Sequence, residues 1–505
     1  MHESNNIYSV IQKVGNDFGN KIAIYNETNS ITYANLITKV NEIASTLKDI
    51  GVESGKFITI IMENCIEYIL TILAINKLNA IIVPINPQYK KNEIQYILDE
   101  TQSEIIITTT YNKHIINSFK HQYKVVTISD KSINIESTEI ESKQSKAKVM
   151  SEKDLALCIF TSGTTGKPKG VLLSNKSILF NIDGVVDRAK YTYNDIVLSS
   201  LPVFHCYSIT VNILSVLRVG ATIDIMDGFI PDKIVNKLEL KNITVFSGAP
   251  VMYNLLLKYL KKEDYNKLSN VRLWLSGGAP LPEKISNEFE LISQKKIVEG
   301  YSLTEASPVV CCNPINAVKI NSIGLPLKNI IIKIVDKNNK IVKSGESGEL
   351  CIKGKNIMQG YLNNKIETNK VLIDGWFYTG DIAIQDQDGY IFIKGRKKEM
   401  ILVGGYNVYP KEIEDCIKNF SNLNVAVVGV SDENLGEKVI AFIEKEKEIS
   451  FSKIDLLREC RKNLANYKIP KEIIYLERLP INSTGKIDKI KLKKKYYDII
   501  RKVTS

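Results

Sequence analysis

A segment rich in Gly, Thr and Lys, Thr161–Gly170, constrains this chain more than any other part of it. It follows the apolar run Leu155–Phe160, which is short enough to be a buried strand. Glycines allow close backbone approach, N–H groups and hydroxyls donate hydrogen bonds, and lysines add positive charge, so such a loop can wrap a polyphosphate. The spacing of a Walker loop is absent. The alternative, a polar surface turn, is less favoured because the segment follows a strand directly.

Length and charge limit the possible classes of protein. A chain of 505 residues is too long for one core, so two or more domains are expected. With 44% hydrophobic and 24% charged residues, the composition is that of an ordinary globular protein. The net charge of +11 and the basic run Lys491–Lys495 raise the alternative of a nucleic-acid or membrane surface. Isolated basic runs are weak signals, so we interpret this run as a solvated helix face and expect no nucleic-acid partner.

Cysteine and histidine usage indicates a reduced compartment and no zinc site. The eight cysteines include no C-x-x-C pair, and the four histidines have no metal-ligand spacing. The polar N-terminus does not resemble a signal peptide. The best candidate for a membrane span, Tyr68–Pro84, is interrupted by Lys77. We therefore expect a cytoplasmic protein without a transmembrane segment, and peripheral contact with a membrane stays open.

Alternating strand-like and helix-like segments predict an α/β fold with largely parallel sheets between about residues 30 and 400. The predicted strands include Phe57–Ile61, Ile105–Ile107, Val197–Leu201, Val245–Ser247 and Val271–Leu275.

The pattern changes after a hairpin-like strand at Gly389–Ile393. A charged loop, Gly395–Glu399, follows, and about 105 residues then remain, enough for a small α+β domain. We predict an N-terminal domain over 1–395, a hinge over 396–399 and a mobile C-terminal domain over 400–505.

Three other segments carry residue types suited to nucleotide chemistry. Gly300–Glu305 offers an aromatic face, hydroxyls and a carboxylate that can hold a hard cation. Tyr378–Asp381 offers a carboxylate for ribose hydroxyls, and Asn482–Lys486 is a second Gly/hydroxyl loop that ends in a lysine. Each segment alone is a weak signal.

Together and in this order, these segments resemble the adenylate-forming family of acyl-CoA synthetases, peptide-synthetase adenylation domains and luciferases. The resemblance runs from Ile31 to Lys486 and includes Leu201–His205, Gly277–Leu281 and Gly404–Pro410. It implies two half-reactions: activation of a carboxylic acid by ATP to an acyl-adenylate with loss of pyrophosphate, and transfer to the thiol of CoA.

The resemblance also implies roles for the matching residues in binding ATP and Mg²⁺. Glu305 would hold Mg²⁺, Thr304 would bind the α-phosphate, and His205 would lie near the carboxylate as an aromatic gate. Lys486 would supply positive charge to the bond being formed, so Lys486→Ala is expected to slow adenylation at least ~10²-fold. We interpret Lys489 and Lys491 as exposed lysines of a basic tail. The implied ATP- and AMP-binding residues are Thr161, Ser162, Gly163, Thr164, Thr165, Lys169, Gly278, Ala279, Pro280, Gly300, Tyr301, Ser302, Thr304, Asp381, Arg396 and Lys486.

Rotation of the small domain about Lys398 would exchange the Lys486 loop for a CoA tunnel at Gly404, Gly405 and Tyr406. A hinge residue needs only to absorb a change in φ and ψ. The alternative is that Arg396–Lys398 is a run of solvated charges, and for Lys397 this interpretation stays open.

The acid is less constrained than the nucleotide. No Asp stands near Val245–Pro250 or Trp274–Ala279 to pair with an ammonium group, which favours an uncharged acyl chain over an amino acid. We predict a medium- or long-chain fatty acid, with an aryl acid such as benzoate or coumarate as the alternative. For His205, the alternative is a satisfied core histidine. The expected acyl pocket contains Phe204, His205, Tyr207, Ile209, Ser276 and Gly277.

The acceptor and the assembly state stay open in part. Only about 18 residues separate Glu305 from Gly324, without the insertion of carrier-loading relatives, which favours CoA. A freestanding ligase that loads a carrier protein is the alternative, and either a monomer or a homodimer is compatible with the chain. A non-catalytic scaffold would be expected to lack Lys486, Glu305 or Asp381, and all three are present.

Overall fold

The computed structural model describes residues 6–129, 132–135, 154–161, 168–240, 242–403, 406–421, 423–432, 435–445, 451–481 and 487–504. The chain folds into two compact units, one of residues 1–332 and 352–377, the other of residues 333–351 and 378–505. In this division residues 378–395 lie in the second unit together with 396–399, and the domain limits predicted above stay a prediction.

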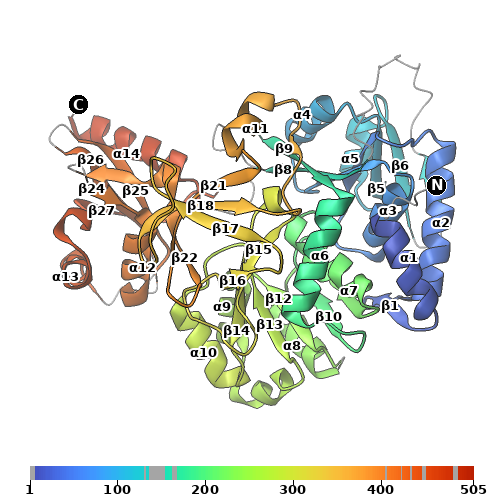
Figure 1. Ribbon diagram of the computed structural model, residues 1–505, viewed down its shortest axis with the longest axis horizontal. Coiled ribbons are helices and arrows are strands. Elements are labelled where there is room, and N and C mark those ends of the chain that lie inside the picture. The colour runs from blue at the N-terminus through green and yellow to red at the C-terminus, as the bar shows by residue number, and fades with distance from the viewer. Residues whose placement is uncertain are drawn as a thin grey trace. The chain divides into compact units, whose positions relative to one another are not determined.

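The first unit contains an eight-stranded sheet whose central strands are parallel (Figure 1). Its strands β3, β4 and β5 are buried along their whole length, as expected for apolar runs covered on both faces. The register aligns Phe57 with Ile81 and Ile58 with Ile105. In spatial order the strands are β19 (Gly360–Tyr361), β9 (Lys169–Ser174), β8 (Leu155–Thr161), β4 (Ile81–Ile85), β3 (Phe57–Ile61), β5 (Ile105–Thr109), β6 (Lys124–Ile128) and β7 (Ile133–Ile135).

A nine-stranded sheet forms the other half of the first unit. β10, β12, β13 and β14 run parallel, with Val245 opposite Leu273 and Trp274 opposite Ile297. In spatial order the strands are β16 (Leu325–Pro326), β15 (Val309–Cys312), β14 (Ile297–Ser302), β13 (Leu273–Ser276), β12 (Val245–Gly248), β10 (Ile196–Ser199), β11 (Thr222–Ile225), β1 (Ile22–Tyr25) and β2 (Ser30–Thr32).

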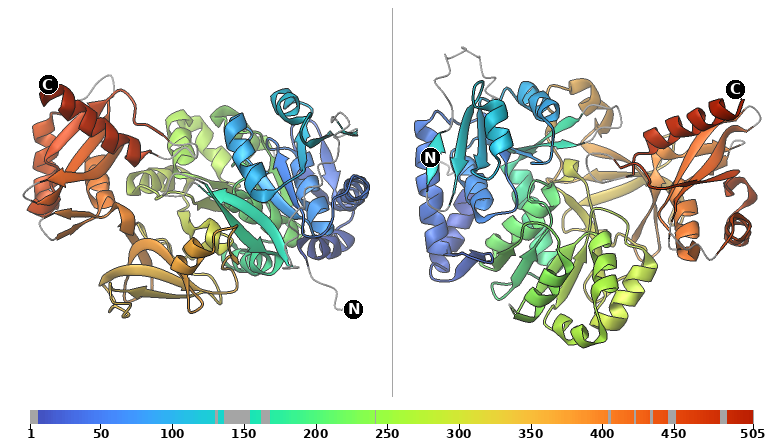
Figure 2. Two further views of the ribbon diagram at one scale, coloured as in Figure 1. Left: turned by 90° about the horizontal axis from the view of Figure 1, so that it is seen from above. Right: turned by 180° about the vertical axis from the view of Figure 1, so that it is seen from behind.

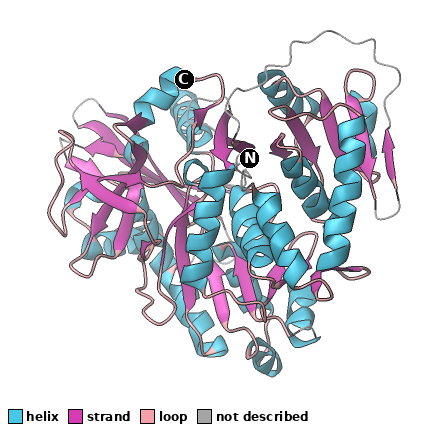
Figure 3. Ribbon diagram, turned by 45° about the vertical axis from the view of Figure 1, so that its right-hand side comes forward, coloured by secondary structure: helices cyan, strands magenta, loops and turns pink. Residues whose placement is uncertain are grey.

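Helices lie against these sheets (Figure 3), and buried apolar side chains of the helices pack on the strands. One core cluster joins α4 and α5 to the first sheet, and another joins α8, α9 and α10 to the second. Ser174, the last residue of β9, caps α6 by accepting a hydrogen bond from the Ser177 backbone, so β9 leads directly into α6. The helices are α1 (Ile7–Asp17), α2 (Tyr33–Asp49), α3 (Ile66–Lys77), α4 (Lys91–Thr101), α5 (Lys113–Phe119), α6 (Asn175–Ala189), the π-helix η1 (Ser208–Leu214), α7 (Ser215–Arg218), α8 (Pro231–Leu240), α9 (Pro250–Tyr259), α10 (Glu283–Ser293) and α11 (Lys365–Val371).

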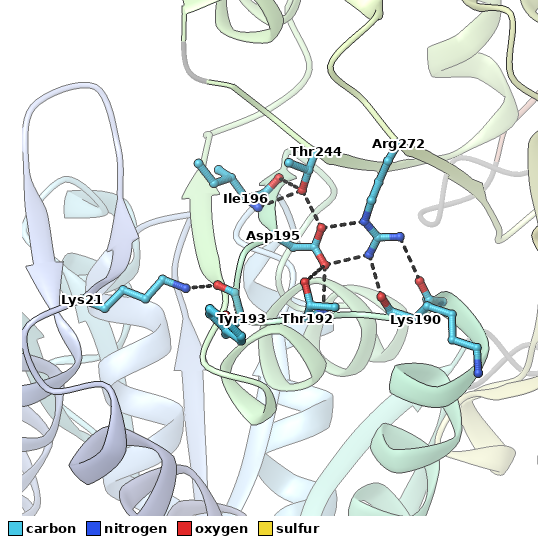
Figure 4. A network of polar contacts seen from close by, with 9 residues as sticks. Lys21, Lys190, Thr192, Tyr193, Asp195, Ile196, Thr244 and Arg272 are labelled. Carbon is cyan, nitrogen blue, oxygen red and sulfur yellow. Dashed lines mark hydrogen bonds and ion pairs between the residues drawn. The ribbon is translucent and has the colours of Figure 1, made fainter.

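A buried carboxylate joins the segments that lead into three parallel strands of the second sheet (Figure 4). Arg272 donates from Nε and Nη2 to the two oxygens of Asp195, each at 2.7 Å, and Thr244 donates to Oδ1 at 2.8 Å. Burial would raise the pKa of Asp195, but hydrogen bonds from Arg272, Thr192 and Thr244 outweigh it and hold the pKa below its usual range. These contacts fix the N-terminal ends of β10, β12 and β13 relative to one another.

A five-stranded sheet that lies mostly in the second unit contains the neighbouring strands β17 (Ile331–Val335), β18 (Ser347–Lys353) and β21 (Trp376–Gln385). β22 (Ile391–Arg396) and β20 (Leu372–Ile373) each pair with β21 in antiparallel register. A second sheet follows, with α12 and α13 packed on one face and α14 on the other (Figure 2). Alternate residues of β25 face the two helix layers, as the period of a strand requires. The elements are β23 (Ile401–Val403), β24 (Tyr406–Val408), α12 (Pro410–Ser421), β25 (Val425–Asp432), β26 (Gly436–Glu444), α13 (Lys453–Asn463), β27 (Glu472–Leu476) and α14 (Lys489–Thr504).

The predicted α/β fold is confirmed, with a large unit rich in parallel strands and a smaller α+β part. The predicted strands Phe57–Ile61, Ile105–Ile107 and Val245–Ser247 are present with ends within two residues of the prediction. Within the described residues, no helix combines the length and the apolar character needed to cross a bilayer.

Candidate active site

The predicted nucleotide-binding segments of the first unit follow the carboxyl ends of parallel strands. Gly277–Pro280 comes after β13, and Ser302–Glu305 comes at the end of β14, the next strand in the sheet. Leu201–His205 follows β10 at the same edge. Ligands of open α/β sheets bind at this edge because the connecting loops converge there. The fold therefore brings three of the predicted segments to one edge of one sheet.

The turn after β13 depends on two glycines. Gly278 has a φ of +82°, which a side chain rarely allows, and a Cβ on Gly277 would lie 2.8 Å from the Tyr207 ring. Beyond Ala279 and Pro280, the backbone N–H of Leu281 donates to Glu299 Oε1 at 3.1 Å. Glu299 lies on β14, so this hydrogen bond fastens the turn to the neighbouring strand.

Glu305 is oriented by a tyrosine from a distant part of the chain. The Tyr361 hydroxyl donates to Glu305 Oε1 at 3.0 Å, and the Met358 N–H donates to the Glu305 carbonyl at 2.9 Å. Glu305 lies in a short 3-10 turn, Thr304–Ala306, directly after β14, with Gly300, Tyr301 and Ser302 on the strand itself. Tyr361 was not among the predicted site residues. No local sequence pattern connects Tyr361 to Glu305, because the two residues lie 56 positions apart in the chain.

The predicted phosphate-binding segment connects two antiparallel strands. Thr161 ends β8, Lys169 begins β9, and the two residues face each other in antiparallel register. The sequence did not predict β9. Ser162, Gly163, Thr164 and Thr165 lie outside the described residues, so their part in phosphate binding stays a prediction.

Lys169 is held by two side chains of the segment Gly360–Glu367. Its Nζ lies 2.5 Å from Glu367 Oε2 and 5.1 Å from the centre of the Tyr361 ring. Hydrogen bonds from Lys169 and Lys370 lower the pKa of Glu367 to about 2. Through the Tyr361 ring and hydroxyl, Lys169 and Glu305 thus share a neighbour.

A small apolar cleft, partly open to solvent, lies among α6, the π-helix and β13–β15. Tyr207, Ser276 and Gly300 line it; the first two belong to the predicted acyl pocket, and the role of this cleft as that pocket stays a prediction. Tyr207 is fixed by a 3.0 Å hydrogen bond with Ser247, and burial raises the pKa of its hydroxyl. The sequence did not predict the other lining residues, which come from several elements: Val185, Arg188, Ala189, Val211, Leu275, Val298, Val309, Cys312 and Leu327.

Four residues predicted for the acyl pocket do not line this cleft. Ile209 is buried in the π-helix, and Gly277 lies close to the Tyr207 ring. His205 is exposed and its ring lies 4.6 Å from that of Phe204. The alternative of a core histidine is therefore wrong, because the residue follows a strand end instead of packing inside the unit.

In the second unit, Asp381 and Arg396 face each other on β21 and β22. Arg396 Nε lies 2.8 Å from Asp381 Oδ1, and Nη1 donates to the Thr379 carbonyl at 3.2 Å. The Asp381 side chain is buried and that of Arg396 is 47% exposed, which leaves the guanidinium accessible. Tyr406 stacks on Tyr467 at 4.6 Å. Lys398 is exposed in a short 3-10 turn, whereas Gly404, Gly405 and Lys486 lie outside the described residues.

Lys489 is the clearest correction to the sequence interpretation. It is not a freely exposed lysine, because its Nζ lies 2.7 Å from Glu399 Oε2 and 2.9 Å from Glu414 Oε1. Lys397 likewise pairs with Glu349 at 2.6 Å. The Lys493–Lys495 stretch is exposed, in agreement with the interpretation of a solvated helix face.

Comparison with known proteins decides the family. Residues 11–362 match the model of the AMP-binding enzymes, and residues 412–486 match the model of their C-terminal domain. The chain belongs to the AMP-binding enzyme family. It is an adenylate-forming acid–thiol ligase that uses ATP, an acyl-CoA synthetase in the broad sense.

Several relatives resemble this AMP-binding enzyme over nearly its whole length. A long-chain-fatty-acid–CoA ligase of Bacillus subtilis (strain 168) is 30% identical over 523 residues, covering 95% of this chain and 93% of the relative. A feruloyl-CoA synthase of Amycolatopsis sp is 29% identical, covering 92% and 94%. The crystal structure of ATP-bound MatB from Rhodopseudomonas palustris superposes with a TM-score of 0.87 at 27% identity, covering 98% and 99%.

Proposed function

We propose that this enzyme activates a medium- or long-chain fatty acid to its acyl-adenylate and then transfers the acyl group to CoA. The cleft beside the π-helix carries this proposal. Its lining is largely aliphatic, and among the residues that the structure describes no Asp or Glu belongs to it. An amino acid would bury its ammonium group there without a counter-charge, which is costly.

Arg188 does not indicate a second carboxylate on the substrate. Its Nη2 donates to the Pro326 carbonyl at 2.9 Å, and its Nη1 donates to the Cys312 carbonyl. Because backbone oxygens already accept from both nitrogens, Arg188 ties α6 to the β15–β16 region. The rest of the cleft suits an alkyl chain, in which each buried CH₂ contributes about 0.8 kcal/mol.

The nucleotide roles follow the positions of the residues. We assign the β- and γ-phosphates to the 161–169 segment with Lys169, the adenine to Gly278–Pro280 and Tyr301, and the α-phosphate to Thr304. The ribose is assigned to Asp381 and Arg396. A carboxylate oxygen of the acid attacks the α-phosphorus and pyrophosphate leaves. Alignment and positive charge lower the barrier, since the nucleophile has no proton to lose at neutral pH.

Glu305 fits a role in holding Mg²⁺. Mg²⁺ usually binds one or two carboxylates together with substrate phosphates. Tyr361 fixes one oxygen of Glu305, and no group of three potential metal ligands occurs among the described residues, so a site completed by the nucleotide agrees with the donor set. Bound there, Mg²⁺ would neutralise phosphate charge.

In the second half-reaction the CoA thiol loses its proton, attacks the acyl carbonyl and displaces AMP. We assign the thiol path to the 404–406 segment, the first half-reaction to Lys486, and the exchange between them to rotation at Lys398. His205 is assigned to the mouth of the acyl site, in keeping with its exposure after β10.

Acid-dependent ATP–pyrophosphate exchange tests the proposal. We expect exchange with octanoate to hexadecanoate, and little with phenylalanine. CoA should then give the acyl-CoA and AMP. Exchange with benzoate or coumarate alone would favour the aryl alternative. An adenylate that reacts with a carrier protein but not with CoA would show that the acceptor is a carrier protein.

A further inference from the structure

We propose that Lys489 is a positioning residue that holds Glu399, the residue after the hinge residue Lys398, to the C-terminal domain. Rotation of that domain is then confined to the backbone at Lys398. The inference rests on the proposed function for its effect on the two half-reactions. Its structural part rests only on contacts within the second unit.

Two charged contacts hold the residues before Lys398 to β18 and β21. Arg396 pairs with Asp381 at 2.8 Å, and Lys397 Nζ lies 2.6 Å from Glu349 Oε2. The other oxygen of Glu349 accepts from the Gly380 N–H at 3.1 Å. Arg396 is therefore held by β21, and Lys397 is held by β18, the neighbouring strand in the same sheet.

The residues after Lys398 are held to a different set of elements. Glu399 binds Lys489, the first residue of α14, at 2.7 Å. Two residues further on, Ile401 is 1% exposed in the core of the C-terminal sheet. Residues up to Lys397 thus contact β18 and β21, whereas residues from Glu399 onward contact α14 and the C-terminal sheet.

Lys489 is itself fixed by a second carboxylate. Its amine lies 2.9 Å from Glu414 Oε1 on α12, and the same oxygen accepts from the Val427 N–H of β25 at 2.8 Å. Burial would lower the pKa of Lys489, but Glu414 and Glu399 outweigh it and raise the pKa, so the amine stays charged. One lysine thereby joins the hinge segment, α12 and the start of α14.

A rotation that kept both sets of contacts would change only the φ and ψ angles between Lys397 and Glu399. Few residues are needed to absorb such a change. Lys489 also lies three residues along the chain from Lys486. Loss of its ion pairs should loosen the start of α14 and the hinge together, and should weaken adenylation more than the CoA step.

The ion pairs of Lys489 with Glu399 and Glu414, here called the Lys489 clamp, can be tested by limited proteolysis with trypsin, without any assay of activity. We compare wild type with Lys489→Met, Lys489→Arg and Lys494→Met, which removes an exposed lysine of the same helix. We expect Lys489→Met to speed cleavage after Lys397 or Lys398 at least ~5-fold, because cleavage follows the population of locally opened states. Lys489→Arg should restore the wild-type rate, and Lys494→Met should not change it. An unchanged rate of cleavage in Lys489→Met would overturn the clamp.

The half-reactions test the consequence. In Lys489→Met, kcat for adenylation should fall about 10-fold with KM for ATP within about 2-fold, while thioester formation from supplied acyl-adenylate should fall less, and Lys489→Arg should recover activity. Equal losses in both steps, or none, would contradict the positioning role. If wild type activates no acid, the proposed function fails, and proteolysis alone decides the clamp.

Discussion

The amine of Lys169 lies 2.5 Å from the carboxylate of Glu367, although the two residues are far apart in the chain. Lys169 begins the strand that follows the predicted phosphate-binding segment, and Glu367 lies in α11. Both side chains are largely buried, at 14% and 21% exposure. The pair gives the lysine a fixed position before any nucleotide is bound.

Lys169→Met should raise KM for ATP about 10-fold or more and leave KM for the acid nearly unchanged, because a charged hydrogen bond contributes about 1.5–3 kcal/mol. Glu367→Gln should cause a smaller rise, since Lys169 keeps its charge but loses its strongest anchor. Steady-state kinetics with each substrate varied in turn would show this. Lys176→Met, an exposed lysine on α6, serves as the control. An unchanged KM for ATP in Lys169→Met would remove this lysine from the nucleotide site.

Tyr361→Phe should increase the Mg²⁺ concentration needed for half-maximal adenylation by about 3- to 10-fold. The variant removes the 3.0 Å hydrogen bond to Glu305 but keeps the ring beside Lys169, and one such bond contributes about 0.5–1.5 kcal/mol. Titration of pyrophosphate exchange with Mg²⁺ measures the effect. If only KM for the acid changed, Tyr361 would not act through Glu305.

Asp195→Asn should lower the free energy of unfolding of the first unit by about 2 kcal/mol. Breaking a fully buried pair costs about 3–5 kcal/mol, but the Arg272 side chain is 35% exposed, so the loss should be smaller. Because the folded-state pKa of Asp195 is lowered, this stability is present above about pH 4 and is lost as pH falls through the folded-state pKa.

Urea denaturation of Asp195→Asn and wild type at pH 7 and pH 3.5 checks both points. The difference between the proteins should be smaller at the lower pH. Asp187→Asn, which removes a largely exposed carboxylate from α6, should behave like wild type. A difference that grew on acidification would mean that Asp195 is not held charged in the folded state.

Val211→Phe should shorten the preferred acyl chain. Val211 lines the cleft and is 2% exposed, so the larger ring must occupy cleft space. The ratio of kcat/KM for hexadecanoate to that for octanoate should fall at least ~10-fold, as the loss of two or three CH₂ contacts implies. A proportional loss for both acids with an unchanged melting temperature would place the acyl chain elsewhere.

The α/β fold could be predicted from the sequence because the central strands are continuous apolar runs. Phe57–Ile61 and Val245–Ser247 lie in central parallel strands, where both faces are buried and the composition is distinctive. β9 was missed because Lys169 and Gly170 read as part of the preceding loop. Its identity as a strand depends on pairing with β8 and β19, which only tertiary structure supplies.

The sequence supports a prediction of site residues where a local motif has suitable residue types, and it does not show the partners that folding brings to those residues. Thr304 and Glu305 follow a strand end, and their types alone suggest phosphate and cation binding. The partners Tyr361, Glu367 and Glu414 lie far along the chain from Glu305, Lys169 and Lys489, so no local spacing marks them. Apart from Tyr207 and Ser276, the residues that line the cleft come from elements as distant in the chain as α6 and β15, so no single segment of the sequence predicts them.

The transfer of oxygen from the acid to AMP tests the central claim most directly. With hexadecanoate labelled by ¹⁸O in both carboxylate oxygens, attack on the α-phosphorus should place one ¹⁸O in each AMP released during acyl-CoA formation. Mass spectrometry of the AMP would show a shift of one label, and none in pyrophosphate. Unlabelled AMP, or label in pyrophosphate or phosphate, would contradict activation at the α-phosphate by the carboxylate.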